Sequence, residues 1–108
     1  MAAPGLVDTR LLGKPRTYGG NKAEWTQWKY VLRSYLGAVN PDLLQPLQES
    51  EVALNPIVLD ALEDKQQGNA RTISFVLSQV LVGAPLQLIM NVSDMNGFEM
   101  WRQLVKAE

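Results

Sequence analysis

The sequence contains no cysteine and no histidine. Without cysteine the chain forms no disulfide, and without both residue types it lacks the ligands of zinc fingers and zinc knuckles. The absence of imidazole excludes every catalytic arrangement in which histidine is the general base. Glycine-rich phosphate loops and the G-x-S-x-G serine motif are also missing. We therefore expect a protein that is not an enzyme and that binds no metal and no cofactor.

The chain also lacks a strong net charge, since the formal value is −1. A protein whose main task is to hold phosphates usually has a basic excess. The charges are nevertheless segregated. Residues 1–40 carry six bases and two acids, whereas residues 41–64 carry six acids and no base. This pattern is typical of solvated helix faces. A sharper hypothesis is that the two charged regions pair between neighbouring copies of the chain.

Long hydrophobic runs are absent as well. The most apolar stretch, residues 73–90, is interrupted by serines, glutamines, Gly83 and Pro85, so we expect no contact with a membrane. The N-terminus has no charged start followed by an apolar run, as a secretory signal would have. We therefore expect an intracellular, cytoplasmic chain. The 108 residues, 46% of them hydrophobic, are enough for one compact domain.

Apolar residues recur every three or four positions in the first half of the chain, and this spacing predicts helices. The first predicted helix begins after Asn21, an N-cap with Glu24 as its capping-box partner, and ends near residue 39. Asn40-Pro41 predicts a short second helix that bends or stops near Pro46. Asn55-Pro56 predicts a third helix that runs through residue 62.

The second half contains the most apolar predicted helix, residues 70–82, which we expect to be covered on several sides. Gly68-Asn69 either separates it from the preceding helix or softens their junction. Gly83 is the expected C-terminal cap, and Pro85 prevents continuation. After a short helical turn at residues 86–90, Asn96 and Glu99 form a second capping box that opens the last helix. That helix reaches Glu108 without a stop signal, so we expect a domain truncated at its C-terminus.

These elements predict an all-α fold, a small bundle of about five helices. Residues 1–17 show no periodicity and are expected to be a flexible arm, so that the domain spans residues 18–108. The apolar stripes of the helices predict the following structural core: Trp25, Trp28, Leu32, Tyr35, Leu77, Leu81, Trp101 and Leu104.

Three groups of residues are candidates for function. Trp25 and Trp28 share the apolar stripe of their helix, which favours a place in the core over an aromatic platform for a base or peptide. Asp60, Glu63 and Asp64 are spaced to share one helix face, and a solvated acidic face is favoured over a metal or acid–base site. The candidate RNA contacts in and beside the arm are Arg10, Lys14, Arg16 and Lys22.

The order of three segments resembles the Gag region of LTR retrotransposons, most closely the copia type. The segments are YGGNKAEWTQWKYVLRSYL, ARTISFVLSQVL and NGFEMWRQL, and the resemblance covers residues 16–108. Asn96 stands where the family more often has threonine or serine. The positions that match the family pattern are Tyr18, Gly20, Trp25, Trp28, Lys29, Tyr35 and Leu36, followed by Asn96, Trp101 and Leu104.

The resemblance implies a domain like the N-terminal domain of a capsid protein, a helical bundle that self-associates into a virus-like particle around the RNA of the element. RNA binding would then depend on other parts of the polyprotein. The charge pattern suggests these assembly contacts: Lys29, Arg33, Asp60, Glu63 and Asp64.

Two alternatives remain open. One is a domesticated Gag-like module that binds a partner peptide in an apolar groove near Trp25 or Trp28. The other is a weak RNA-binding domain that uses the N-terminal arm.

Overall fold

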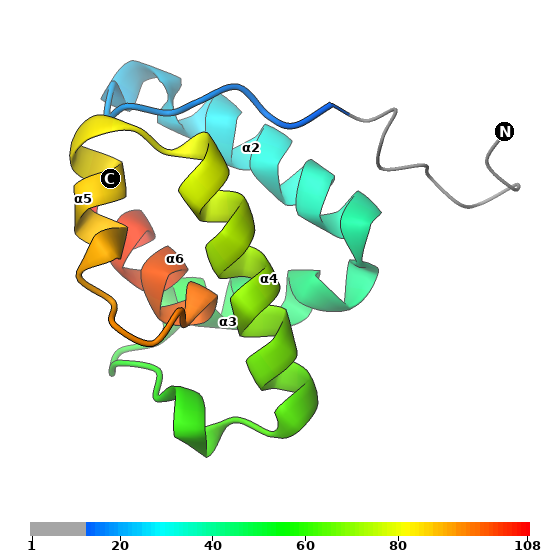
Figure 1. Cartoon of the computed structure of the whole chain (residues 1–108). Helices are drawn as coiled ribbons and strands as arrows, with labels where there is room; N and C mark the ends of the chain where they lie inside the picture. Colours follow the sequence, from blue (N-terminus) through cyan, green and yellow to red (C-terminus); the bar gives the residue numbers. More distant parts are fainter. Residues whose placement is uncertain (1–12) are drawn as a thin grey trace, which may run out of the picture.

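A computed structural model describes residues 13–108, which form five α-helices and two short 3-10 helices (Figure 1). Within these residues the backbone forms no strand, and one isolated parallel bridge joins Tyr18 to Leu81. The predicted all-α bundle of about five helices is confirmed. The elements are α2 (Lys22–Val39), η1 (Pro41–Leu43), α3 (Leu44–Val52), η2 (Leu59–Ala61), α4 (Asp64–Val80), α5 (Gly83–Met90) and α6 (Gly97–Ala107).

Helix α6 is the element around which the bundle packs, since α3, α4 and α5 all contact it (Figure 1). Its first turn approaches α4 backbone to backbone at Gly97. A side-chain carbon at this position would collide with Ala70 O, Ser74 N and Ile73 Cβ. Glycine is therefore required here for close packing and not for a turn.

Helix α4 is less enclosed than its composition predicts. One face is buried and includes Ile73, Leu77 and Val80, but Phe75 is 66% exposed. The helix begins at Asp64 and continues without a break through Gly68-Asn69. The expected coverage on several sides is thus wrong, because the centre of the bundle belongs to α6.

The segment before α2 runs back along that helix and is held to the bundle (Figure 1). Tyr18 N–H donates to Val80 O at 2.9 Å, and Val82 N–H donates to Tyr18 O at 3.0 Å. Pro15 is buried, and Arg16 O accepts a hydrogen bond from the Trp28 indole. The packed domain therefore begins before residue 18. Residues 1–12 of the expected arm lie outside the described part of the chain.

Two predicted helix boundaries differ from the structure in the first half of the chain. Helix α3 passes through Pro46, its third residue, because backbone N–H groups in the first turn need no partner within the helix. Residues 53–58 are not helical, although Asn55-Pro56 is a good helix start. Both backbone polar groups of Ile57 are instead bound by side chains of α6 and its cap.

Gly83 does not end a helix but begins one. Helix α4 ends at Val80, and Gly83 adopts a φ of +63° as the first residue of α5. Pro85 then occupies the first turn of α5, where its missing N–H costs nothing. The glycine and the proline therefore mark a sharp change of direction between two helices.

Candidate functional site

The two tryptophans of α2, Trp25 and Trp28, form a cluster with Tyr18 and Trp101. The ring centroids of Trp25 and Trp28 are 5.7 Å apart and stacked, and Tyr18 lies 5.1 Å from Trp28. Trp101 joins the cluster at 5.9 Å from Trp25. These distances are in the range at which aromatic pairs add stability beyond their buried area. The cluster therefore holds the N-terminal segment, α2 and α6 together.

Six of the eight predicted core residues are buried, and the other two are partly buried and pack against the core. The two are Trp25 and Tyr35. Trp28 Nε1 donates to Arg16 O at 2.8 Å, so its polar atom is satisfied inside the protein. Five surface cavities are lined by residues 13–98, and neither Trp25 nor Trp28 lines any of these five. Trp28 thus lies in the core, and Trp25 packs against the core from a partly exposed position.

Glu51 of α3 links two of the sequence-predicted residues. Its carboxylate pairs with Lys29 Nζ at 2.8 Å and accepts the Trp101 indole N–H at 3.1 Å. Both charged side chains of the pair are largely shielded from solvent. Lys29, predicted as an assembly contact, therefore belongs to an internal ion pair between α2 and α3, and that expectation is corrected.

Glu99 is the centre of a second buried polar network. Its carboxylate accepts hydrogen bonds from the Arg102 guanidinium, the Gln103 amide and the Ile57 N–H, each at 2.8 Å. Burial alone would raise the pKa of Glu99, but the hydrogen bonds from Arg102, Gln103 and Ile57 outweigh burial and hold the pKa at about 2. Asn96 Nδ2 donates to Ile57 O at 2.8 Å. Residues of α6 thereby fix both backbone groups of Ile57.

The predicted acidic helix face is not a helix face. Asp60 lies in η2, Glu63 precedes α4, and Asp64 is the first residue of α4. The three residues would share a helix face only if one helix included them all, and α4 begins four residues after Asp60. All three side chains are exposed. We use the name acidic segment for residues 54–64, which also expose Leu54 (93%) and Val58 (60%).

An exposed surface of mixed character lies where α2 meets α3. Tyr30 is 74% exposed, and it lines a shallow depression of about 300 Å³ together with Arg33, Ser34 and Leu44. We name these four residues the α2–α3 face. Arg33 makes no ion pair within residues 13–108. The face thus combines apolar side chains with an available positive charge.

The candidate RNA contacts do not form one patch. Arg10 lies outside the described residues. Lys14 lies beside the middle of α2 with Val31, Arg16 donates to the Gln27 side chain, and Lys22 donates to Ala107 O at 3.1 Å. The described bases therefore lie at different points along α2, from Lys22 to the neighbourhood of Val31, which is a helix length of about 14 Å at 1.5 Å per residue.

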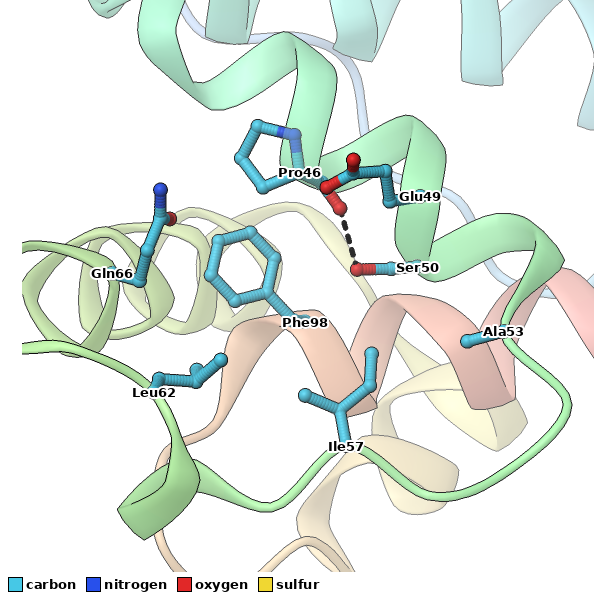
Figure 2. A pocket seen from close by; sticks show the side chains of 8 residues that line it. All are labelled: Pro46, Glu49, Ser50, Ala53, Ile57, Leu62, Gln66 and Phe98. Carbon is cyan, nitrogen blue, oxygen red and sulfur yellow. Dashed lines mark hydrogen bonds between the residues drawn. The ribbon is translucent and has the colours of Figure 1, made fainter.

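A groove lies between α3, the loop before η2, and the starts of α4 and α6 (Figure 2). Its apolar part is a cavity of about 270 Å³, lined by Ala53, Ile57, Leu62 and Phe98 and bordered by Glu49 and Gln66. A polar cavity of about 370 Å³ shares Glu49 and Gln66 with it and adds Asp42 and Lys65. The two cavities adjoin at these shared residues, and together we call them the groove, with an apolar end and a polar end.

The sequence did not predict the roles of several residues beneath the surface: Glu51, Phe98 and Glu99. Glu99 was assigned to a capping box, but its side chain reaches the loop before η2 instead of its own helix start. Glu51 and Phe98 carried no signal beyond their helical spacing. The spacing of Glu99 to Arg102 and Gln103, three and four residues later on the same helix, was the one sequence feature that indicated this hydrogen-bond network.

The described residues show no further chemical centre. Within residues 13–108, no group of three or more acidic side chains lies close enough together to hold a metal ion. None of the helices in this range combines the length and the apolar character that crossing a bilayer requires.

Comparisons of the chain with protein-family models, with curated proteins and with solved structures found no match. The function therefore has to be inferred from the residues and their arrangement.

Proposed function

We propose that the chain is the structural domain of a Gag-type polyprotein of a copia-type LTR retrotransposon. Copies of it associate into a capsid-like shell around the RNA of the element in the cytoplasm, and the domain catalyses no reaction. The order of the family-like segments supports this proposal. Their apolar positions, among them Trp28, Trp101 and Leu104, lie together in the core of a small helical bundle.

The observation that carries the proposal is a pair of exposed surfaces with complementary chemistry. The α2–α3 face offers Tyr30 and Leu44 beside the positive Arg33. The acidic segment offers Leu54 and Val58 beside three exposed carboxylates. Both surfaces expose apolar side chains, and the charges beside these side chains are opposite.

A contact between these two surfaces joins different patches of neighbouring copies. Such head-to-tail contacts repeat from copy to copy, and they generate rings or open assemblies instead of closed pairs. Burying an aliphatic side chain such as Leu54 contributes about 1.5–3 kcal/mol. The opposite charges contribute mainly specificity and register. This is the type of contact on which a shell of many copies depends.

Sedimentation velocity over a wide range of chain concentrations tests the proposal. The wild-type chain is expected to show a sedimentation coefficient that rises with concentration. Leu44→Asp is expected to abolish the rise, because it places a carboxylate within the apolar contact. Lys106→Glu and Met90→Asp, which change exposed residues outside both surfaces, are expected to leave it unchanged.

A charge-swap series then tests the pairing of the two surfaces. Arg33→Glu alone is expected to weaken association, and so is the joint reversal of Asp60, Glu63 and Asp64 to lysine. The chain that carries both changes is expected to regain association, because the charges are again opposite. A wild-type chain that remains monomeric throughout contradicts the proposal. Failure of the combined chain to recover contradicts the pairing of these two surfaces.

A further inference from the structure

The groove of Figure 2 shares no lining residue with the α2–α3 face, and from the acidic segment it uses Ile57 and Leu62. Its two ends differ in chemistry. We propose that it binds a peptide segment of another protein in which one or two aliphatic side chains stand next to basic residues. The aliphatic side chains occupy the apolar end, and the basic residues lie at the polar end beside Glu49.

The apolar end has the size and lining of a pocket for side chains. Its volume of about 270 Å³ is below the range of about 300–1,000 Å³ in which pockets enclose whole small ligands. Phe98 is buried beneath it, and Ile57 and Leu62 form the wall opposite α3. In Figure 2 the ring of Phe98 lies between Gln66 and the residues of α3. The apolar lining and this volume suit one or two aliphatic side chains.

The charge around the polar end favours a basic partner. The charged side chains that line the polar cavity are Asp42, Glu49 and Lys65. Lys65, the base that lines the polar cavity, is already paired with Asp42 at 3.4 Å. Glu49 makes no ion pair within residues 13–108, and it lines both cavities. A lysine or arginine next to an apolar anchor would thus meet an uncompensated carboxylate.

The wall of the groove is fixed before any ligand arrives. Ile57 is held at both backbone groups by Glu99 and Asn96, and the Glu99 carboxylate is itself held by Arg102. A loop that is already ordered loses little conformational entropy on binding, so more of the contact energy remains as affinity. The buried network of α6 therefore has a consequence for recognition as well as for stability.

The groove and the proposed assembly contact use different side chains of the same loop. Ala53 and Ile57 line the groove, whereas Leu54 and Val58 are exposed outside it. Occupation of the groove therefore leaves Leu54 and Val58 available for assembly. The two proposals are consequently tested by different substitutions.

Fluorescence anisotropy with labelled eight-residue peptides tests the groove. The probe contains two leucines followed by a lysine and an arginine, and it is expected to bind the full chain saturably. A peptide with serines in place of the leucines is expected not to bind. A peptide with glutamates in place of the two bases is expected to bind about tenfold more weakly, since each 1.4 kcal/mol is a factor of ten.

Two variants of the chain test the location of binding. Ala53→Phe fills the apolar end and is expected to abolish binding, whereas Ala84→Phe, an exposed position on α5, is the matched control. Glu49→Lys is expected to weaken binding about tenfold without changing the sedimentation of the chain. Asp94→Lys makes the same charge change at an exposed position between α5 and α6 and is expected to bind normally.

Amide chemical shifts of the wild-type chain provide a readout that holds even where Ala53→Phe fails to fold. Titration with the probe is expected to shift the amides of Ile57, Gln66 and Phe98. The proposal is overturned by non-saturable binding, by equal binding of the serine peptide, or by shifts confined to the α2–α3 face. It is also overturned if concentrating the chain alone shifts the amides of Gln66 and Phe98, which lie outside the acidic segment, because a second copy then occupies the groove.

Discussion

Replacement of Glu99 by glutamine tests the buried network that fixes the loop before η2. The carboxylate accepts hydrogen bonds from Arg102, Gln103 and Ile57 N–H, and these bonds hold its pKa at about 2. The difference from a value of about 4.5 for a free glutamate corresponds to about 3 kcal/mol of stability at 1.36 kcal/mol per pH unit. Glu99→Gln is expected to lose about this amount at pH 7, a large part of the stability of a small domain.

The pH dependence of this effect follows from the direction of the pKa change. Because the pKa of Glu99 is lower in the folded chain, its contribution is complete above the pKa of the unfolded chain. It is lost as the pH falls towards 2. The free energy of unfolding of wild type is therefore expected to fall between pH 5 and pH 2.5 more steeply than that of Glu99→Gln. At the acidic end the two curves are expected to converge.

Urea denaturation followed by tryptophan fluorescence at pH 7, 5, 3.5 and 2.5 measures both quantities. Glu63→Gln, which removes an exposed carboxylate, is the matched control and is expected to change stability by less than about 0.5 kcal/mol. Equal pH slopes for wild type and Glu99→Gln would refute the account of the network. A loss at pH 7 no larger than that of the control would refute it as well.

Two further predictions concern packing and the N-terminal segment. Gly97→Ala is expected to destabilise the chain by about 1–3 kcal/mol or more, because the new methyl group would meet the backbone of α4. Gly68→Ala places its methyl group in open space and is expected to stabilise α4 by about 1 kcal/mol. Thermal melts of both variants decide this point, and equal effects would contradict the close contact of α6 with α4. Burial and the hydrogen bond to Glu108 raise the pKa of Tyr18 above its ordinary value, so its contribution is complete below pH 10 and is lost as the pH rises beyond that. Tyr18→Phe is therefore expected to flatten the loss of stability above pH 10 in urea titrations, and an unchanged slope would show that Tyr18 ionises freely.

Local signals were sufficient to predict the helices that carry most of the core. Asn21 and Asn96 cap α2 and α6 as predicted, and both side chains accept a backbone N–H in the first turn. The stripe from Trp28 to Leu36 identified the buried face of α2. These features depend on residues within one or two turns of each other, so their spacing in the sequence contains the information.

The features that sequence reasoning missed depend on residues far apart in the chain. Residues 53–58 are not helical because Asn96 and Glu99, about forty positions later, bind Ile57. Lys29 turns inward because α3 places Glu51 beside it. No local pattern predicts either partner, and both determine which charged groups remain on the surface. The candidate site was therefore less predictable than the fold.

Hydrogen exchange measured by mass spectrometry at low and high chain concentration tests the proposed assembly most directly. Association through the proposed contact predicts slower exchange at high concentration in peptides that cover residues 30–34, 44 and 54–64. Peptides from α5 should exchange at the same rate at both concentrations. Exchange that does not depend on concentration, or protection confined to segments outside the two surfaces, would contradict the account.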